Sequence, residues 1–155
     1  MHPNAVRVVE AAAALGVDIE VREFPEGTKT AADAARAIGC AQAQIVKSLV
    51  FTVDDEPVVA LVSGANRLDE KKLAAVAGGS SVRPASADTV RASTGYPIGG
   101  VPPFAHATAL RTFIDADLLS FDVVWAAAGT PRCVFAIQPA DLARLSDGAK
   151  ADLSG

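Results

Sequence analysis

The chain has 155 residues, of which 50% are hydrophobic and 21% are charged, and its formal net charge is −4 at pH 7. This length is typical of one domain that buries roughly two thirds of its unfolded surface, so we expect a single domain over residues 1–155. The negative charge argues against binding along duplex DNA, because such affinity is built from many phosphate contacts.

No apolar run approaches the roughly 20 residues of a membrane span, and the start "MHPNAVRVVE" lacks the features of a signal peptide. We therefore expect a cytoplasmic protein. Cys40 and Cys133 are far apart, without a CxxC motif or a neighbouring histidine cluster. This pattern favours two reduced thiols over a disulfide or a metal site. The sequence also lacks the phosphate-binding and zinc motifs, and we predict no metal and no cofactor.

Periodicity and capping signals predict five helices, in chain order over residues 4–15, 30–39, 70–77, 86–95 and 139–146. Strand-like runs cover residues 17–24, 43–51, 57–63, a short stretch around residue 82, and 110–115, 123–128 and 133–138. The turn at 54–56 makes a hairpin of the second and third runs. Hairpins mixed with helices indicate an α+β domain around a largely antiparallel or mixed sheet. The tail, 147–155, is expected to be frayed.

Lys47 is the one charged residue of the run "AQIVKSLVF". At the period of a strand it shares its side with Leu49, Phe51 and Val53, which is the apolar side. Desolvating an unpaired ammonium costs several kcal/mol. Either the long stem carries the charge to water near the strand's start, or this side opens into a pocket that uses it. The run by itself favours the first interpretation.

The segment "GYPIGGVPPF" stands out because Gly99 and Gly100 permit positive φ and leave backbone N–H groups uncovered. Its prolines stiffen the backbone. A rigid loop of this kind can hold a carbonyl or a developing oxyanion without reorganising. Such loops are common as surface turns, but the stretch 96–108 is longer than most connections.

The familiar catalytic constellations are missing. Ser63 in "LVSGAN" does not lie in a G-x-S-x-G motif. His2 is close to the N-terminus, and His106 is as compatible with a structural role as with a catalytic one. A Ser-His-Asp esterase is therefore unsupported, and a DNA-binding regulator lacks a recognition helix with a basic face.

Four segments, in order, resemble the YbaK/ProX family: "TAADAARAIGC", "QIVKSLVF", "GYPIGGVPPFA" and "WAAAGTPRCVFAIQPADLARL". This family is related to the editing (insertion) domain of bacterial prolyl-tRNA synthetase, and the resemblance covers nearly the whole chain. It implies a pseudo-barrel fold with surrounding helices. It also implies hydrolysis of the ester that joins a wrong amino acid to the 3′ end of tRNA.

The resemblance carries site residues with it. The family's key lysine corresponds to Lys47 and its glycine loop to residues 99–101, so Lys47 and Gly100 are the expected catalytic residues. The loop at 24–30 is expected to line the pocket. The residues expected to bind the substrate are Phe24, Thr30, Ser48, Gly99, Val101 and Ala127.

Four positions depart from the pattern of better-known relatives. Lys29 stands where those relatives tend to carry an aromatic residue, and Ala105 where they often carry glycine. Ala127 and Val134 replace a serine and an aspartate of the cysteine-editing branch. These departures leave the identity of the edited amino acid open.

The expected activity is trans-editing of tRNA, with the tRNA for proline as the favoured carrier, mischarged with alanine, serine, cysteine or 2-aminobutyrate. Lys47 would pair with the terminal phosphate or the substrate carbonyl, and the N–H groups of Gly100 and Val101 would polarise the ester. No general base can be assigned. The alternative is an accessory module that binds tRNA or a synthetase, such as prolyl-tRNA synthetase, without hydrolysis. We expect a monomer or a homodimer that contacts the 3′ end of aminoacyl-tRNA.

Overall fold

The computed structural model of the chain describes residues 1–25, 28 and 30–155. Its strands form two sheets, one three-stranded in the order β1-β7-β6 and one five-stranded in the order β4-β2-β3-β5-β8. The strands of the smaller sheet are β1 (Val21–Glu23), β6 (Val124–Ala127) and β7 (Cys133–Ile137). Those of the larger sheet are β2 (Val46–Val53), β3 (Glu56–Ser63), β4 (Val82–Pro84), β5 (Arg111–Asp115) and β8 (Ala149–Ala151).

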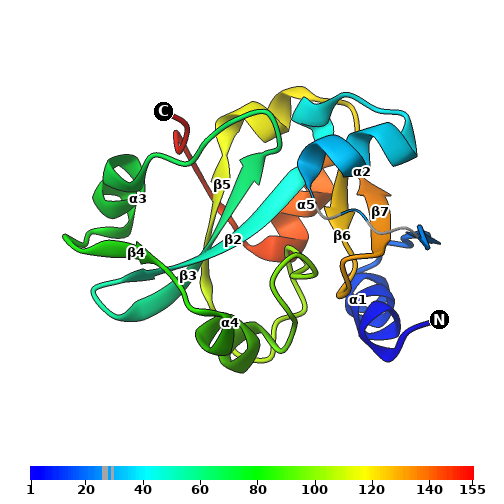
Figure 1. Cartoon of the computed structure of the whole chain (residues 1–155), viewed down its shortest axis with the longest axis horizontal. Coiled ribbons are helices and arrows are strands. Elements are labelled where there is room, and N and C mark those ends of the chain that lie inside the picture. Colours follow the sequence, from blue (N-terminus) through cyan, green and yellow to red (C-terminus); the bar gives the residue numbers. More distant parts are fainter. Residues whose placement is uncertain (26–27, 29) are drawn as a thin grey trace.

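The smaller sheet is antiparallel throughout, whereas the larger one is mixed: β2 pairs antiparallel with β3 and β4, and β5 pairs parallel with β3 and β8. A parallel bridge between Ile45 and Trp125 connects the start of β2 to β6, and thus links the two sheets. This arrangement confirms the predicted α+β fold with its mixed sheet and hairpin (Figure 1).

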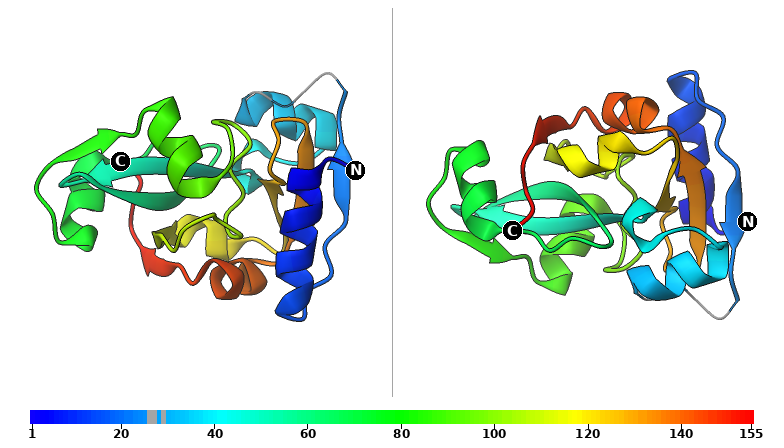
Figure 2. Two further views of the ribbon diagram at one scale, coloured as in Figure 1. Left: turned by 90° about the horizontal axis from the view of Figure 1, so that it is seen from below. Right: turned by 90° about the horizontal axis from the view of Figure 1, so that it is seen from above.

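The helices are α1 (Pro3–Ala14), α2 (Ala31–Ile38), α3 (Glu70–Ala77), α4 (Ala87–Thr94) and α5 (Pro139–Ser146). Their ends follow the capping signals: Thr30 Oγ1 accepts a hydrogen bond from the N–H of Asp33, and Gly39 takes a left-handed conformation after α2. Figure 2 shows α1 beside the smaller sheet and α3 at the far end of the larger one. Across the residues that the structure describes, each helix is too short or too polar to cross a membrane.

The two faces of the β2–β3 hairpin bury different clusters. Val46 and Val50 face the main core, which lies between the sheets and includes Phe135 and residues of α1, α4 and α5. Phe51 and Val53 face a second cluster with Leu73, Phe113 and Leu153, among others. The strand therefore has the period of two that was expected of it.

The C-terminal tail differs from expectation, because residues 147–155 are ordered rather than frayed. β8 extends the larger sheet by pairing with β5, and Leu153 is fully buried in the second cluster. The composition of the tail is polar and includes glycine, and a single leucine, Leu153, provides its apolar contact. Composition therefore did not indicate that the tail is ordered. The first strand is also shorter than predicted, since only Val21–Glu23 joins the ladder with β7.

Candidate active site

A cavity of about 390 Å³ lies along the edge of β2. One edge of β2 pairs with β3. On the opposite edge, between Ile45, which bridges to Trp125, and Phe51, which pairs with Pro84 of β4, no described residue forms a neighbouring strand. The wall is completed by the first turn of α2, the 98–101 loop, and parts of β6 and β7. The lining residues include Thr28, Thr30, Ala31, Ala34, residues 45–51, Val90, Ile98, Gly99, Val101, residues 125–127 and Val134.

Most of the expected site residues meet at this cavity. Lys47, Ser48, Thr30, Gly99, Val101 and Ala127 all contribute to its wall, although they come from four separate segments of the chain. Phe24 and Gly100 are not among the lining residues. Lys29, one of the departures from the family pattern, lies outside the described residues.

Lys47 is partly buried, and its ammonium has one acceptor among the residues that the structure describes. Nζ donates a hydrogen bond of 2.6 Å to the backbone carbonyl oxygen of Asn66. Burial lowers the pKa of this lysine from its usual value. None of the acidic side chains in the described part of the chain forms an ion pair with it. The charge therefore retains hydrogen-bonding capacity for an anion or a carbonyl from outside.

Ser48 projects to the other face of β2, because neighbouring residues of a strand alternate. Its hydroxyl oxygen is buried and has no hydrogen-bond partner among the described residues. Buried hydroxyl groups in folded proteins nearly always have a partner. Since Ser48 lines the cavity, this unused hydroxyl is a candidate contact for a bound molecule.

The 96–106 loop is tied to itself by two side chains. The Tyr96 hydroxyl donates to the carbonyl oxygen of Ala105, at 2.8 Å. His106 Nε2 lies 2.7 Å from the carbonyl oxygen of Pro102, which requires that this nitrogen carry the hydrogen. Burial lowers the pKa of His106. His106 does not line the cavity, so its observed role is to brace the loop.

The glycine pair has a different use from the expected one. The N–H of Gly100 donates to the carbonyl oxygen of Pro97 at 3.0 Å, closing a tight turn in which Gly99 has a φ of +86°. This N–H is therefore not free for a substrate, contrary to expectation. The N–H groups of Gly99 and Val101 have no acceptor among the described residues, and both residues line the cavity.

Close packing explains why residue 100 is glycine. A Cβ atom there would lie 2.8 Å from the Cα atom of Thr130 and 2.9 Å from its carbonyl carbon. Thr130 belongs to the turn between β6 and β7, so the missing side chain lets two loops meet. Gly100 thus fixes the height of the loop above the cavity.

An aromatic rim that the sequence reasoning did not single out lies next to the cavity. The Arg22 guanidinium carbon is 5.4 Å from the ring centre of Trp125 and 5.2 Å from that of Phe24. Trp125 lines the cavity, whereas Phe24 lies outside it. Trp125 is the one tryptophan of the chain, and its position next to the alanine-rich end of a strand is the signal that could have identified it.

The chemistry available in the cavity is binding and polarisation. Ala127 and Val134, where the cysteine-editing branch carries polar groups, make this part of the wall apolar. Among the described lining residues there is no histidine, cysteine or carboxylate. The Lys47 ammonium, the Ser48 hydroxyl and the N–H groups of Gly99 and Val101 have unused hydrogen-bonding capacity there. Such groups can orient an ester but do not supply a general base.

A family model and a solved structure are both similar to this chain over most or all of its length. The model of the aminoacyl-tRNA editing domain matches residues 25–145. A crystal structure named "a putative trans-editing enzyme for prolyl tRNA synthetase" is 44% identical, with a TM-score of 0.94, over 100% of this chain and 99% of that one.

Two sequence relatives place this similarity in context. The "Putative Cys-tRNA(Pro)/Cys-tRNA(Cys) deacylase EbsC" of Enterococcus faecalis is 28% identical over 153 residues, which cover 97% of this chain and 92% of that protein. The proline–tRNA ligase of Maridesulfovibrio salexigens is 38% identical over 94 residues, which cover 61% of this chain but only 16% of the ligase. The chain thus corresponds to a small part of the ligase, and from the family match and the shared fold we conclude that it belongs to the family of aminoacyl-tRNA editing domains.

Proposed function

We propose that this protein is an aminoacyl-tRNA deacylase that removes a wrong, small amino acid from the 3′ end of tRNA. The observation that carries the proposal is the Lys47 ammonium, which lines a largely apolar cavity and, among the described residues, has one backbone carbonyl as its acceptor. A buried charge without a counterion is costly. An anionic or strongly polar ligand would offset that cost.

In the proposed reaction, water attacks the ester carbonyl carbon and the bond from that carbon to the ribose oxygen breaks. The hydroxyl of water stays on the amino acid, and its proton ends on the ribose oxygen. Lys47 pairs with the terminal phosphate or the substrate carbonyl, and the N–H of Val101 remains as a candidate donor to the ester oxygen, whereas the N–H of Gly100 is occupied by Pro97. Because an aminoacyl ester is already activated, orientation and fixed charge supply the catalysis.

We propose the tRNA for proline as the carrier, in agreement with the names of the relatives. A cavity of about 390 Å³ is within the range of small-molecule sites and leaves room for a small amino acid with part of the terminal nucleoside. The apolar wall at residues 126–127 and 134 favours alanine or 2-aminobutyrate over a polar side chain. An apolar pocket excludes larger residues well but ranks small ones by only ~1–3 kcal/mol per methylene.

A panel of proline tRNAs charged with alanine, serine, cysteine, 2-aminobutyrate or proline tests the proposal. We expect hydrolysis of at least one small-residue ester and sparing of the prolyl ester. An acceptor-stem minihelix should be hydrolysed nearly as well as whole tRNA, because a chain of net charge −4 is expected to make few phosphate contacts. Loss of activity on the minihelix would show that the protein reads the body of the tRNA.

The second candidate is an accessory module that binds aminoacyl-tRNA or a synthetase without hydrolysis. The absence of a general base among the described lining residues and the apolar Ala127 and Val134 favour this candidate. It predicts measurable binding of the minihelix but hydrolysis at the uncatalysed rate for every ester of the panel. The deacylation panel therefore separates the two functions directly.

A further inference from the structure

Asn66 connects the Lys47 ammonium to a polar network outside the cavity. Its carbonyl oxygen accepts the hydrogen bond from Lys47 Nζ at 2.6 Å, and its side-chain Nδ2 donates to Asp117 Oδ2 at 2.7 Å. Asn66 follows β3 in a turn closed by its own N–H, which donates to the carbonyl oxygen of Ser63. Neither Asn66 nor Asp117 lines the cavity. Among the described lining residues, Lys47 is the one to which Asn66 is hydrogen-bonded, and it connects this pair to a bound molecule.

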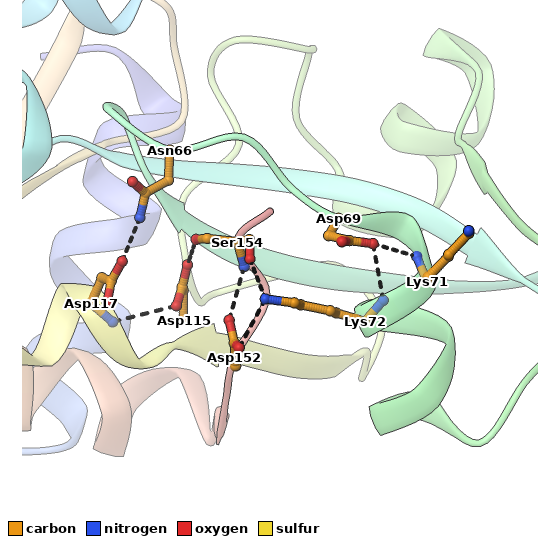
Figure 3. A network of polar contacts seen from close by, with 8 residues as sticks. All are labelled: Asn66, Asp69, Lys71, Lys72, Asp115, Asp117, Asp152 and Ser154. Carbon is orange, nitrogen blue, oxygen red and sulfur yellow. Dashed lines mark hydrogen bonds and ion pairs between the residues drawn. The ribbon is translucent and has the colours of Figure 1, made fainter.

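Asp117 is held from the other side by the end of β5. Its N–H donates to Oδ1 of Asp115, a carboxylate that is only 1% exposed. The Ser154 hydroxyl donates to the same carboxylate, which joins the C-terminal tail to this corner (Figure 3). On the far side of Ser154, Lys72 pairs with Asp152 and donates to the carbonyl oxygen of Ser154. Asp117 thus provides a fixed point to which the Asn66 turn is attached.

We propose that the hydrogen bond between Asn66 and Asp117 is a positioning contact for Lys47. It holds the carbonyl of residue 66 in place, and this carbonyl in turn aims the ammonium at the substrate. The inference rests on the proposed function, because it takes Lys47 as the group that contacts the substrate.

The geometry of lysine explains the need for such support. Its charge sits at the end of a flexible four-carbon stem, and in the described structure only one acceptor fixes it. That acceptor lies in a turn rather than within a strand, so its position depends on local contacts. A displacement of about 1 Å in a group that contacts the reacting atoms can lower a rate by up to a hundredfold.

Asp117→Ala tests the contact without changing Asn66, Lys47 or the cavity wall. We expect kcat for deacylation to fall about fivefold, the size that loss of one ordinary hydrogen bond would give, with stability nearly unchanged because Asp117 is exposed. Asp152→Ala is the matched control, since it removes an exposed carboxylate from the same network but one that is connected to Asn66 only indirectly, through Ser154 and Asp115. Equal loss of activity in the two variants would overturn the proposal.

A reciprocal exchange gives a second, independent test. Asn66→Asp places two carboxylates against each other and should lower kcat at least as far as Asp117→Ala does. Adding Asp117→Asn restores the hydrogen bond with the roles exchanged, because the amide at position 117 then donates to the carboxylate at position 66. The kcat of the double variant should return to within about twofold of the original protein. Failure of the double variant to recover beyond Asn66→Asp alone would contradict the positioning role.

The titration of Lys47, followed by NMR of its 13Cε nucleus, separates positioning from a general loss of fold. A weaker carbonyl acceptor favours the neutral amine, so the pKa of Lys47 should be lower in Asp117→Ala than in Asp152→Ala or the original protein. An unchanged titration curve would overturn the inference. The same NMR signal is assigned with Lys47→Ala. Full activity of Lys47→Ala would contradict the proposed function of Lys47. If Lys47→Ala is inactive but Asp117→Ala behaves as the original protein, only the positioning role is contradicted.

Discussion

Substitution of Gly100 by alanine tests how the loop is fixed above the cavity. The added Cβ would lie 2.8–3.0 Å from the Cα, C and N atoms of Thr130, well inside ordinary van der Waals contact. Because these are backbone atoms, they cannot rotate away, and one of the two loops must move. Overpacking of this kind costs about 1–3 kcal/mol, which corresponds to a fall in Tm of about 2–4 °C per kcal/mol for a domain of this size.

Gly99→Ala is the matched variant. Its added Cβ would meet only Pro131 Cγ at 3.9 Å, so the cost is limited to that of a positive φ, about 1–2 kcal/mol. Both variants are compared by denaturant unfolding and by deacylation at saturating substrate. We expect Gly100→Ala to lose about tenfold in kcat because Val101 moves with the loop, and Gly99→Ala to lose less. Wild-type stability and activity in Gly100→Ala would refute the assignment of the Thr130 contact.

Three further substitutions probe other parts of the fold. Leu153→Ala should lower the free energy of unfolding by about 2–5 kcal/mol, because the side chain is fully buried; a change below about 0.5 kcal/mol would mean that the tail is frayed after all. Ser48→Ala should leave stability equal or slightly higher, since it removes a buried hydroxyl without a described partner, and should slow deacylation if the hydroxyl contacts the substrate. Burial lowers the pKa of His106, so the folded state binds this proton less readily than the unfolded state. Its contribution to stability is complete above about pH 6.5 and is lost as the pH falls through the folded-state pKa. Denaturant unfolding across pH 4–8 should therefore show a shallower acid loss in His106→Gln, and an identical pH profile would contradict this.

Local sequence signals were sufficient for most of the architecture. The helix ends at Thr30 and Gly39 follow from side-chain capping and positive φ, which depend on neighbouring residues alone. The two faces of β2 follow equally from alternation. The tail was mispredicted because its order depends on a distant partner: β8 exists only as an addition to β5, and Leu153 only fills a cluster built by other strands.

The sequence suggested which residues would form the site, but not how they would be arranged. The family pattern identified Lys47 and the glycine loop, and the fold brings most of the expected residues to one cavity. Which N–H groups of the loop remain free could not be read from the sequence, since the turn that occupies the N–H of Gly100 becomes visible only in the folded backbone. Asn66 was missed because its backbone, not its side chain, contacts Lys47.

The most direct test of the proposed role of Lys47 is a single-turnover deacylation assay with the original protein and with Lys47→Ala. The substrate is the tRNA for proline mischarged with alanine. We expect the variant to fold, because the one hydrogen bond lost is offset by removal of a partly buried charge. Its rate should fall by a factor on the order of a hundred or more, the scale for loss of one preorganised electrostatic contact. Lys47→Arg should recover little of it, since a planar guanidinium does not replace a compact ammonium. A folded Lys47→Ala protein that deacylates at the original rate would contradict both the mechanism and the assignment of the cavity.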